Sequence, residues 1–422
     1  MNNNKERLLK RGQLMYIFEA TFEYFISILV AGSYLATLTK YLGFSDSLTG
    51  ILSSFISLGC LFQLLSISVQ KSRVKRFVIL FSIINQLLFM LLYVVPLTSG
   101  SKPIRTVLFV IFIFLAYLIY NFVHPKKINW FMSLVDDSHR GDFTANKEMV
   151  SLVSGLGFTF LMGAVVDYFA EQNKIKTAFI ISAAVIFILM LLHTLTMVLT
   201  VEKEISHPIN KKFSQSIGEL FKNKKVLQVT AVFILYNISH YASVPFYGTY
   251  LIGELGFSLK LVSVLAMLGS VSRVLVSKLW GRYADKNSFA AMIEKCFLVL
   301  CVSQVCVVFS APANGKVLFA LYYILHGIAM GGINSALINL IYDYIEPERR
   351  ADSLAVTQAA SGLVGFLTTL CISPIISAIQ ANGDKVFGIS IYAQQFVTVI
   401  SLLFTVCAIL YVRFVIISKK KR

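Results

Sequence analysis

Residues 177–200 read TAFIISAAVIFILMLLHTLTMVLT, a run of 24 residues without a single Asp, Glu, Lys or Arg. An α-helix rises about 1.5 Å per residue, so this run would be roughly 36 Å long. The hydrocarbon core of a bilayer is about 30 Å thick, and about 20 apolar residues are enough to cross it. The run therefore predicts a transmembrane helix.

The composition of the whole chain also indicates a membrane protein. Of its 422 residues 57% are hydrophobic and only 14% are charged, and the mean hydropathy is +0.74. A soluble domain carries about 25% charged residues, so this chain lacks the polar surface that water requires. Helices satisfy their own backbone groups in lipid, and the expected fold class is therefore an all-α membrane protein. The polar start, Met1–Arg11, precedes an apolar run too long for a cleaved signal peptide, so we expect the first helix to be retained.

Twelve segments resemble residues 177–200 in length and apolar character, and each is a predicted transmembrane helix. They cover residues 14–38, 47–70, 75–97, 104–124, 146–169, 176–200, 226–251, 257–279, 289–311, 316–342, 354–379 and 389–415. The connection at 201–225 separates a first bundle at 1–200 from a second at 226–422. Its apolar residues recur at helical spacing between lysines, which fits either an amphipathic helix on the membrane surface or a solvated linker.

The net charge of +17 is distributed unevenly. Alternate connections and both termini hold 29 of the 38 Lys and Arg residues, Lys126 and Lys127 among them, whereas the other connections hold eight. Cytoplasmic loops are enriched in Lys and Arg, so both termini are predicted to lie on the cytoplasmic side of the cytoplasmic membrane. The basic charge is thus a topology signal, and no nucleic-acid partner is expected.

Several functional signatures are missing from the sequence. The six cysteines lie in apolar segments, and their spacing suggests packing residues rather than disulfides or a zinc site. There is no Walker A, H-E-x-x-H, G-x-S-x-G or C-x-x-C pattern. We therefore expect neither an ATP-driven pump nor an enzyme, and we expect no cofactor and no resident metal.

Short stretches of the first half recur in the second. Leu42-Gly43-Phe44-Ser45 follows the first predicted helix, and Leu255-Gly256-Phe257-Ser258 follows the seventh. At an offset of 210, Arg140 and Asp142 align with Arg350 and Asp352. Such repetition predicts two pseudo-symmetric six-helix bundles of the same orientation.

Between the eighth and ninth predicted helices the chain reads Gly281-Arg282-Tyr283-Ala284-Asp285-Lys286. With twelve helices and duplicated halves, this segment resembles the major facilitator superfamily and its G-x-x-x-D-[RK] loop signature. The chain departs from that signature, because Ser68 and Ser72 replace the Gly and Asp of the first-half copy and the basic tail after Lys286 is missing. The resemblance implies secondary transport by alternating access, with Gly281, Asp285 and Lys286 in a cytoplasmic gate.

Two repeated ion pairs are expected to join this gate. They are Arg140 with Asp142, and Arg350 with Asp352, at the starts of the fifth and eleventh predicted helices. Exposed ion pairs are usually worth about 1 kcal/mol or less, so an alternative is that these pairs only anchor loops.

The first predicted helix carries two acidic residues at membrane depth. Glu19 and Glu23 lie one turn apart on the face that bears Tyr16. Carboxylates so close in a low-dielectric site repel each other, and burial disfavours both charges. We expect the pair to take up and release a proton or to bind a cationic group of a substrate. A solvated position near the cytoplasmic surface is the alternative for Glu19.

Polar and aromatic residues form stripes on the fourth, seventh and tenth predicted helices, which with the first line the central cavity in the superfamily that the chain resembles. The residues assigned to substrate binding are Tyr117, Asn121, His124, Tyr236, His240, Tyr323, His326 and Asn334. Aromatic rings with a few hydrogen-bonding groups suit a sugar, nucleoside, amino acid or aromatic drug. Each residue alone is equally well explained by an interhelical hydrogen bond, and His193 in the sixth helix is interpreted as a packing residue.

One arginine lies inside a predicted span and away from both of its ends. Arg273 precedes Gly281 by eight residues, and a guanidinium at that depth is costly without a partner. We expect it to pair within the protein as part of the gate, and a substrate anion is the alternative.

The predicted function is secondary active transport of a small organic solute across the cytoplasmic membrane, coupled to protons through Glu19 and Glu23. Multidrug or metabolite efflux is an alternative within transport. A lipid scramblase or receptor on the same scaffold is an alternative outside it. The expected partners are the solute, protons and the lipid bilayer, and the protein is expected to be a monomer.

Overall fold

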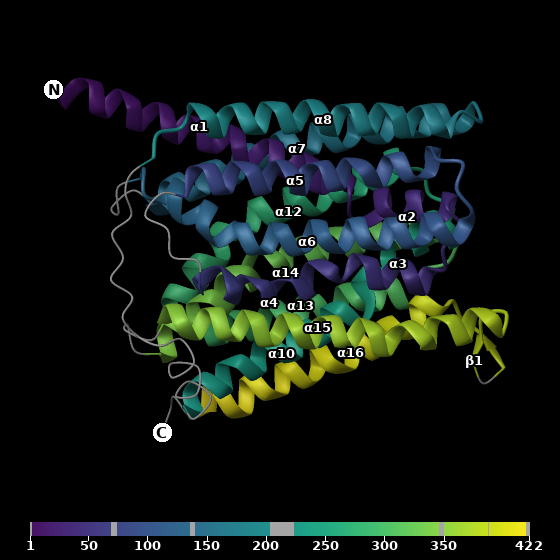
Figure 1. The fold of residues 1–422 in the computed structure, drawn as a ribbon. Coiled ribbons are helices and arrows are strands. Elements are labelled where there is room, and N and C mark those ends of the chain that lie inside the picture. The colour runs from purple at the N-terminus through teal and green to yellow at the C-terminus, as the bar shows by residue number, and fades with distance from the viewer. Residues whose placement is uncertain are drawn as a thin grey trace. The chain divides into compact units, whose positions relative to one another are not determined.

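The structure is a computed structural model that describes residues 2–68, 74–135, 140–202, 223–345, 350–386 and 388–418. Nearly all of them lie in helices (Figure 1). Two compact units make up the chain. Unit 1 comprises Met1–Phe44, Phe62–Pro208 and Ser258–Ser263, and unit 2 comprises Ser45–Leu61, Ile209–Phe257 and Val264–Arg422. Most of the predicted amphipathic segment at 201–225 lies outside the described residues.

Unit 1 is built mainly from the first half of the chain. Its helices are α1 (Asn2–Leu29), α2 (Gly32–Tyr41), α5 (Lys75–Val94), η1 (Val95–Leu97), α6 (Lys102–Met132), α7 (Arg140–Glu171) and α8 (Ile175–Leu199). Two helices are shared between the units, namely α4 (Phe55–Ser68) and α12 (Leu259–Lys286).

Unit 2 is built mainly from the second half. Its elements are α3 (Asp46–Ser53), α10 (Lys224–Ser243), η3 (Val244–Phe246), α11 (Tyr247–Thr249), η4 (Tyr250–Glu254), α13 (Phe289–Val308), α14 (Gly315–Tyr344), α15 (Arg350–Ala381), β1 (Lys385–Val386), β2 (Ile389–Ser390), α16 (Ala393–Tyr411) and η6 (Val412–Ile417). The two strands form a small antiparallel hairpin.

Ten helical segments in the described ranges are long and apolar enough to cross a membrane, and the predicted all-α membrane fold is confirmed. The two other predicted spans are interrupted helices. The helix expected at 47–70 is divided into α3 and α4 at Ser54. The helix expected at 226–251 changes to a 3-10 turn at Pro245, which lacks the N–H that a continuous helix needs. The structure is therefore consistent with twelve crossings, although these two helices are not continuous.

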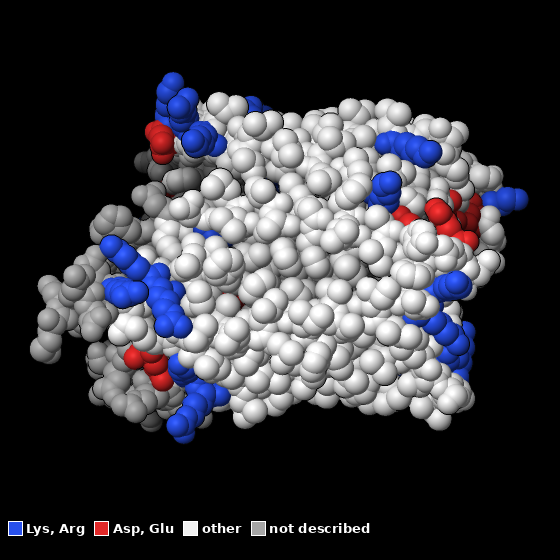
Figure 2. Space-filling view, turned by 90° about the horizontal axis from the view of Figure 1, so that it is seen from above, with Lys and Arg blue, Asp and Glu red and all other residues white. Residues whose placement is uncertain are grey.

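The surface agrees with a membrane environment. In Figure 2 most of the visible Lys, Arg, Asp and Glu side chains lie toward the two ends of the helices, and a broad uncharged band lies between them. Large apolar side chains are exposed, such as Leu161 on α7 and Leu275 on α12, which are 61% and 70% exposed. Extensive apolar surface of this kind is unfavourable in water and suits the hydrocarbon layer of a bilayer.

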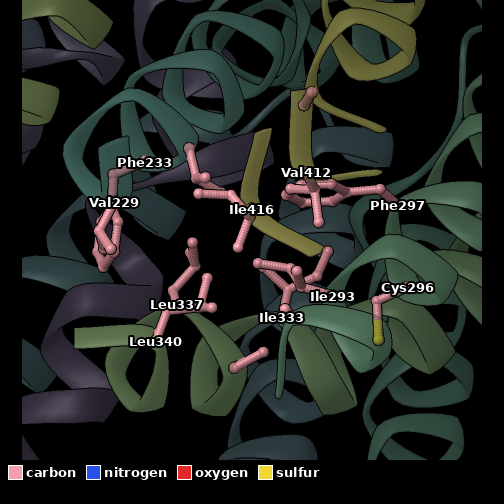
Figure 3. Packing of buried hydrophobic residues seen from close by; sticks show 14 of the residues in the cluster. Val229, Phe233, Ile293, Cys296, Phe297, Ile333, Leu337, Leu340, Val412 and Ile416 are labelled. Carbon is pink, nitrogen blue, oxygen red and sulfur yellow. The ribbon is translucent and has the colours of Figure 1, made fainter. Parts of the chain in front are cut away.

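A core cluster in unit 2 illustrates the packing between its helices. Figure 3 shows apolar side chains from α10, α13, α14 and η6 converging on one another. The fully buried members include Val229, Phe297, Ile333 and Val412. Close van der Waals packing of these side chains holds the four elements together.

The repeated Leu-Gly-Phe-Ser segment forms the same turn in both halves. Gly43 and Gly256 have φ values of +69° and +64°, a left-handed conformation that glycine adopts without the steric penalty of a Cβ. The hydroxyl of the serine that follows, Ser45 or Ser258, accepts a hydrogen bond from the backbone N–H three residues later, at 3.2 Å in both copies. This is a helix N-cap, so the sequence repeat corresponds to a structural repeat.

An aspartate lies at the helix start after each of these turns. In unit 1 the carboxylate of Asp167, on α7, accepts hydrogen bonds from the backbone N–H groups of Leu259 at 2.9 Å and Lys260 at 2.6 Å. In unit 2 the carboxylate of Asp46, at the start of α3, accepts hydrogen bonds from the side-chain amides of Gln380 and Gln394 at 2.9 and 2.7 Å. Negative charge at a helix N-terminus is favourable, and these contacts help to tie α12 to unit 1 and α3 to unit 2.

Candidate functional site

A polar pocket lies within unit 1, between α1, α5 and α6. Its lining residues are Glu23, Phe81, Ser82, Asn85, Gln86, Ile119, Tyr120, Val123, His124 and Lys127. Gln86 is buried, and its side-chain oxygen has no hydrogen-bond partner in the described part of the chain. The pocket therefore combines apolar walls with several groups able to bind a polar ligand.

The ammonium group of Lys127 joins the two acidic residues of the first helix. Lys127 Nζ lies 2.8 Å from Glu19 Oε1 and also donates a hydrogen bond to Glu23 Oε2. The side chains of Lys127 and Glu19 are only 5% and 1% exposed, whereas that of Glu23 is 20% exposed. The expected repulsion between the carboxylates is therefore offset by a cation between them, and the surface position considered for Glu19 is wrong.

The assignment of Lys127 to a cytoplasmic loop is also wrong. The helix predicted to end at residue 124 continues as α6 through Pro125 to Met132, so Lys127 lies within the helix and is buried. A proline lacks a backbone N–H and commonly ends a helix, which explains why the sequence suggested an earlier end. The missed signal was the spacing of Tyr120, His124 and Lys127, because residues three or four apart share a helix face.

His193 on α8 completes the cluster. Its Nε2 lies 2.8 Å from Glu19 Oε1, and because a carboxylate can only accept here, Nε2 carries the proton and donates it. Its Nδ1 is buried without a hydrogen-bond partner among the described residues. The interpretation of His193 as a packing residue is therefore wrong, because the imidazole fixes the orientation of Glu19.

The cluster has an unbalanced charge. Lys127 supplies one positive charge against two carboxylates, so these three side chains have a net charge of −1 when both carboxylates are ionised. Charge in a low-dielectric site is unfavourable unless it is compensated. One added proton would bring the cluster to neutrality.

The same cluster meets the spacing of a metal site. One ligand atom from each of Glu19, Glu23 and His193 lies within 4.8 Å of the others. However, the Lys127 ammonium already bonds both carboxylates, and a divalent cation beside it would be repelled. These residues therefore suit a lysine counter-ion better than a metal, and we assign no metal to them.

Only part of the predicted stripe on the fourth helix reaches the pocket. Tyr120 and His124 line it, with ring centroids 5.0 Å apart. Asn121 is instead buried, where it donates a hydrogen bond to the Tyr117 carbonyl at 2.9 Å and accepts one from Gln63 at 2.9 Å. Tyr117 packs edge-on against Phe89. Tyr117 and Asn121 thus have structural contacts and do not line this pocket.

Unit 2 contains a corresponding pocket between α10, α13 and α14, the helices that match α1, α5 and α6 in the repeat. It is lined by Tyr236, Ser239, His240, Ser243, Val244, Tyr247, Leu300, Gln304, Tyr322 and His326. Tyr236, His240 and His326 were predicted to bind the substrate, and all three line this pocket. Tyr323 was also predicted, but the neighbouring Tyr322 lines the pocket in its place. The ring of Tyr323 packs instead beside Phe319 and Tyr322. Asn334 is exposed and does not line the pocket. Two of the lining residues, Ser239 and Gln304, belong to a hydrogen-bonded network with Ser401 and Thr405.

The described residues of the predicted gate lie on the surface near the end of α12. A Cβ at Gly281 would meet nothing within 4 Å, and Asp285 and Lys286 are exposed, with no ion pair to another described residue. The side chains of Arg140, Asp142, Arg350 and Asp352 lie outside the described part of the structure.

Arg273 lies midway along α12 and is half-buried. Within the described ranges, its guanidinium forms neither a hydrogen bond nor an ion pair, so the expected partner inside the protein is not found.

Comparison with known proteins identifies the family. The sequence model of the Major Facilitator Superfamily matches residues 17–369, which is most of the chain, and the chain therefore belongs to this superfamily of membrane transporters. A search of curated protein sequences gives no match.

Solved structures share the fold. A mutant of the nucleoside transporter NupG aligns with a TM-score of 0.74 at 13% identity, covering 95% of this chain and 99% of that one. A bacterial homologue of the human lysosomal transporter Spinster aligns with a TM-score of 0.69 at 13% identity, covering 97% and 96%. The POT family transporter PepTSo aligns with a TM-score of 0.69 at 11% identity, covering 96% and 98%. Identities this low relate the fold and not the substrate.

Proposed function

We propose that this protein is a proton-coupled secondary transporter of a small organic solute in the cytoplasmic membrane, with both termini in the cytoplasm. The observation that carries the proposal is the buried cluster of Lys127 with Glu19, Glu23 and His193 beside a polar pocket. Ionisable groups within a membrane are costly and are kept where they serve transport or coupling.

The two carboxylates have different roles in this mechanism. Glu19 is fully buried and bonded to both Lys127 and His193, so it serves as the permanent counter-ion of the lysine. Glu23 is partly exposed and lines the pocket, so its proton exchanges with water. Protonation of Glu23 removes the net charge of −1 while Lys127 stays paired with Glu19. The neutral cluster then crosses between the two access states at lower electrostatic cost.

The test replaces the exchanging carboxylate without changing its shape. A thermal-shift screen of the purified protein against nucleosides, sugars, amino acids and cationic drugs first identifies a transported ligand. In proteoliposomes with an imposed pH gradient, Glu23→Gln should abolish uphill accumulation of that ligand while exchange of labelled for unlabelled ligand continues. Glu171→Gln removes an exposed carboxylate from the end of α7 and should accumulate ligand normally. Uphill accumulation that persists in Glu23→Gln would remove proton coupling from this residue.

Gating is assigned to the cytoplasmic end of α12, in the conformation that closes that side. There Gly281 would allow close helix contact, and Asp285 would bind the N-terminus of a neighbouring helix. The other residues assigned to the gate are Lys286 and the pairs Arg140/Asp142 and Arg350/Asp352. Arg273 was grouped with this gate, but its surroundings favour another role.

The gate is tested by the charge of Asp285. Asp285→Asn should lower kcat about tenfold, equivalent to about 1.4 kcal/mol on the closing step, and should leave the Kd for the ligand unchanged. Asp285→Glu, which keeps the charge, should retain most of the turnover. Equal turnover of the Asn variant and the unmodified protein would rule out this contact as a gate.

A further inference from the structure

Arg273 has an unusual position for a charged residue, midway along a membrane-spanning helix of the second half. Arg273 lies thirteen residues before Lys286, the last residue of α12, which corresponds to about 20 Å along the helix axis. Arg273 is therefore within the span and not at the end of the helix. Its charge must therefore be compensated within the protein or by a bound ligand.

No compensating group is found in the described ranges of the structure. The salt bridges there involve Lys127, His193 and Arg413 but not Arg273. By contrast, Lys127 in unit 1 has two carboxylates and is almost fully buried. The first-half cation is thus saturated, whereas the second-half cation has free hydrogen-bonding capacity.

The surroundings of Arg273 connect it to the pocket of unit 2. At this level the backbones of α12 and α14 pack directly against each other. A Cβ added at Gly331 would lie 3.1 Å from the carbonyl oxygen of Arg273. A Cβ added at Gly269 would lie 2.9 Å from the carbonyl oxygen of Tyr323. Two residues of α14, Tyr322 and His326, line the pocket. Arg273 therefore lies on a helix that packs directly against the α14 wall of the pocket.

The pocket itself supplies hydrogen-bonding and aromatic groups without charge. Its lining consists of tyrosine, histidine, serine, glutamine and aliphatic side chains, with no Asp, Glu, Lys or Arg. A ligand that satisfied both the pocket and the arginine would have an uncharged ring or hydroxyl-bearing body and one negative group. A guanidinium binds carboxylate and phosphate oxygens in a bidentate manner.

We propose that Arg273 binds the anionic group of the transported solute, a carboxylate or a phosphate, while the body of the solute occupies the pocket between α10, α13 and α14. This inference rests on the proposed transport function and specifies its substrate class as organic anions. A guanidinium contact at this site discriminates against the neutral analogue of the same molecule, because the analogue would leave the charge uncompensated.

The experiment tests charge preference before the solute has been identified. Water-soluble metabolites extracted from cells are separated by ion exchange into anionic, neutral and cationic pools, and each pool is added to the purified protein in a thermal-shift assay. The matched probes uridine 5′-monophosphate and uridine, and nicotinate and nicotinamide, are added in parallel. The anionic pool should raise Tm, and the neutral and cationic pools should not.

Variants connect the effect to the residue. Arg273→Gln should abolish the Tm rise from the anionic pool, or raise the Kd of an anionic ligand isolated from it at least about tenfold, the loss expected for a close charge pair. Arg273→Lys should retain part of the binding. Lys278→Gln removes an exposed cation from the same helix and should bind like the unmodified protein.

Three outcomes would overturn the inference. One is stabilisation by the neutral or cationic pool, another is no stabilisation by the anionic pool, and the third is equal binding of anion by Arg273→Gln. If vesicles of phosphatidylglycerol stabilise the protein in an Arg273-dependent manner while the soluble anions do not, the arginine binds a lipid headgroup and the substrate assignment fails. A neutral solute that is accumulated under a pH gradient would refute this inference and leave the proposed transport function intact.

Discussion

Asp384 is an acidic residue in the turn between α15 and β1, outside the membrane-spanning segments. Its φ of 55° is in the left-handed region, which Asn and Asp tolerate better than other residues with a side chain. Burial raises the pKa of Asp384, and the nearby carboxylate of Asp46 acts in the same direction, while a hydrogen bond from the Ala393 backbone opposes them. The folded protein therefore disfavours the charge of this side chain.

Replacement of Asp384 by Asn should stabilise the protein at neutral pH. Because the pKa of this acid is higher in the folded state, the folded state binds more protons between the ordinary and the raised pKa, and stability falls as pH rises through that range. Asp384→Asn removes this loss and keeps the left-handed turn, so its Tm should be higher at pH 7 and equal at low pH. Asp384→Ala also removes the charge but strains the turn, and its gain should be smaller. A Tm difference for Asp384→Asn that does not vary between pH 4 and 7 would contradict this account.

The candidate site could be predicted from single residues only in part. Glu19 and Glu23 were identifiable because acidic residues one turn apart in an apolar run have few structural explanations. Lys127 and His193 were not identified, because a lysine after a proline resembles a loop residue and a single histidine resembles a packing residue. Both depend on tertiary contacts with α1 that the local sequence does not encode. Tyr322, and not the predicted Tyr323, lines the pocket. These two residues are adjacent on α14, and the periodicity of apolar residues does not determine the rotation of a helix to within one residue.

At the scale of elements, the repeats were the most informative part of the sequence. The Leu-Gly-Phe-Ser segments predicted related halves, and both copies form a glycine turn followed by a serine N-cap. Helix interruptions were less predictable. Pro125 lies inside a continuous helix, whereas Pro245 coincides with a change of helix type. A proline therefore marks a weak point, and packing decides whether the helix continues.

Close contact between α12 and α14 depends on a glycine in each helix. A Cβ at Gly327 would collide with the Gly269 carbonyl oxygen, a backbone atom that cannot move aside by a rotamer change. Gly327→Ala should therefore lower the stability by about 1–3 kcal/mol, as overpacking does, and this should appear as a lower Tm in detergent. Gly157→Ala on α7, where a Cβ would meet nothing within 4 Å, should leave Tm unchanged or slightly higher. Similar Tm values for the two variants would contradict the close contact.

At the scale of the whole chain, the compact units do not coincide fully with the two sequence halves. Residues 45–61 belong to unit 2 and residues 258–263 belong to unit 1. These short segments follow the repeated turns, and their neighbours include Gln380 and Asp167, which are far away in sequence. Apolar periodicity identifies the faces of helices but not which helix each end contacts, so this exchange could not be predicted.

Each unit contains a cation within a helix, Lys127 in unit 1 and Arg273 in unit 2, and these two charges determine how transport depends on the membrane potential. Within the helices, the charges of Glu19, Glu23, Lys127 and Arg273 sum to zero, and a monovalent anion with one proton adds no net charge. The voltage across a membrane acts only on net charge that moves, at about 2.3 kcal/mol per charge per 100 mV. With a monovalent carboxylate as the solute, uptake should therefore be electroneutral and insensitive to a potassium diffusion potential imposed with valinomycin. A gradient of one pH unit, worth about 1.4 kcal/mol, should alone support about tenfold accumulation, so this carrier would work equally well in depolarised cells.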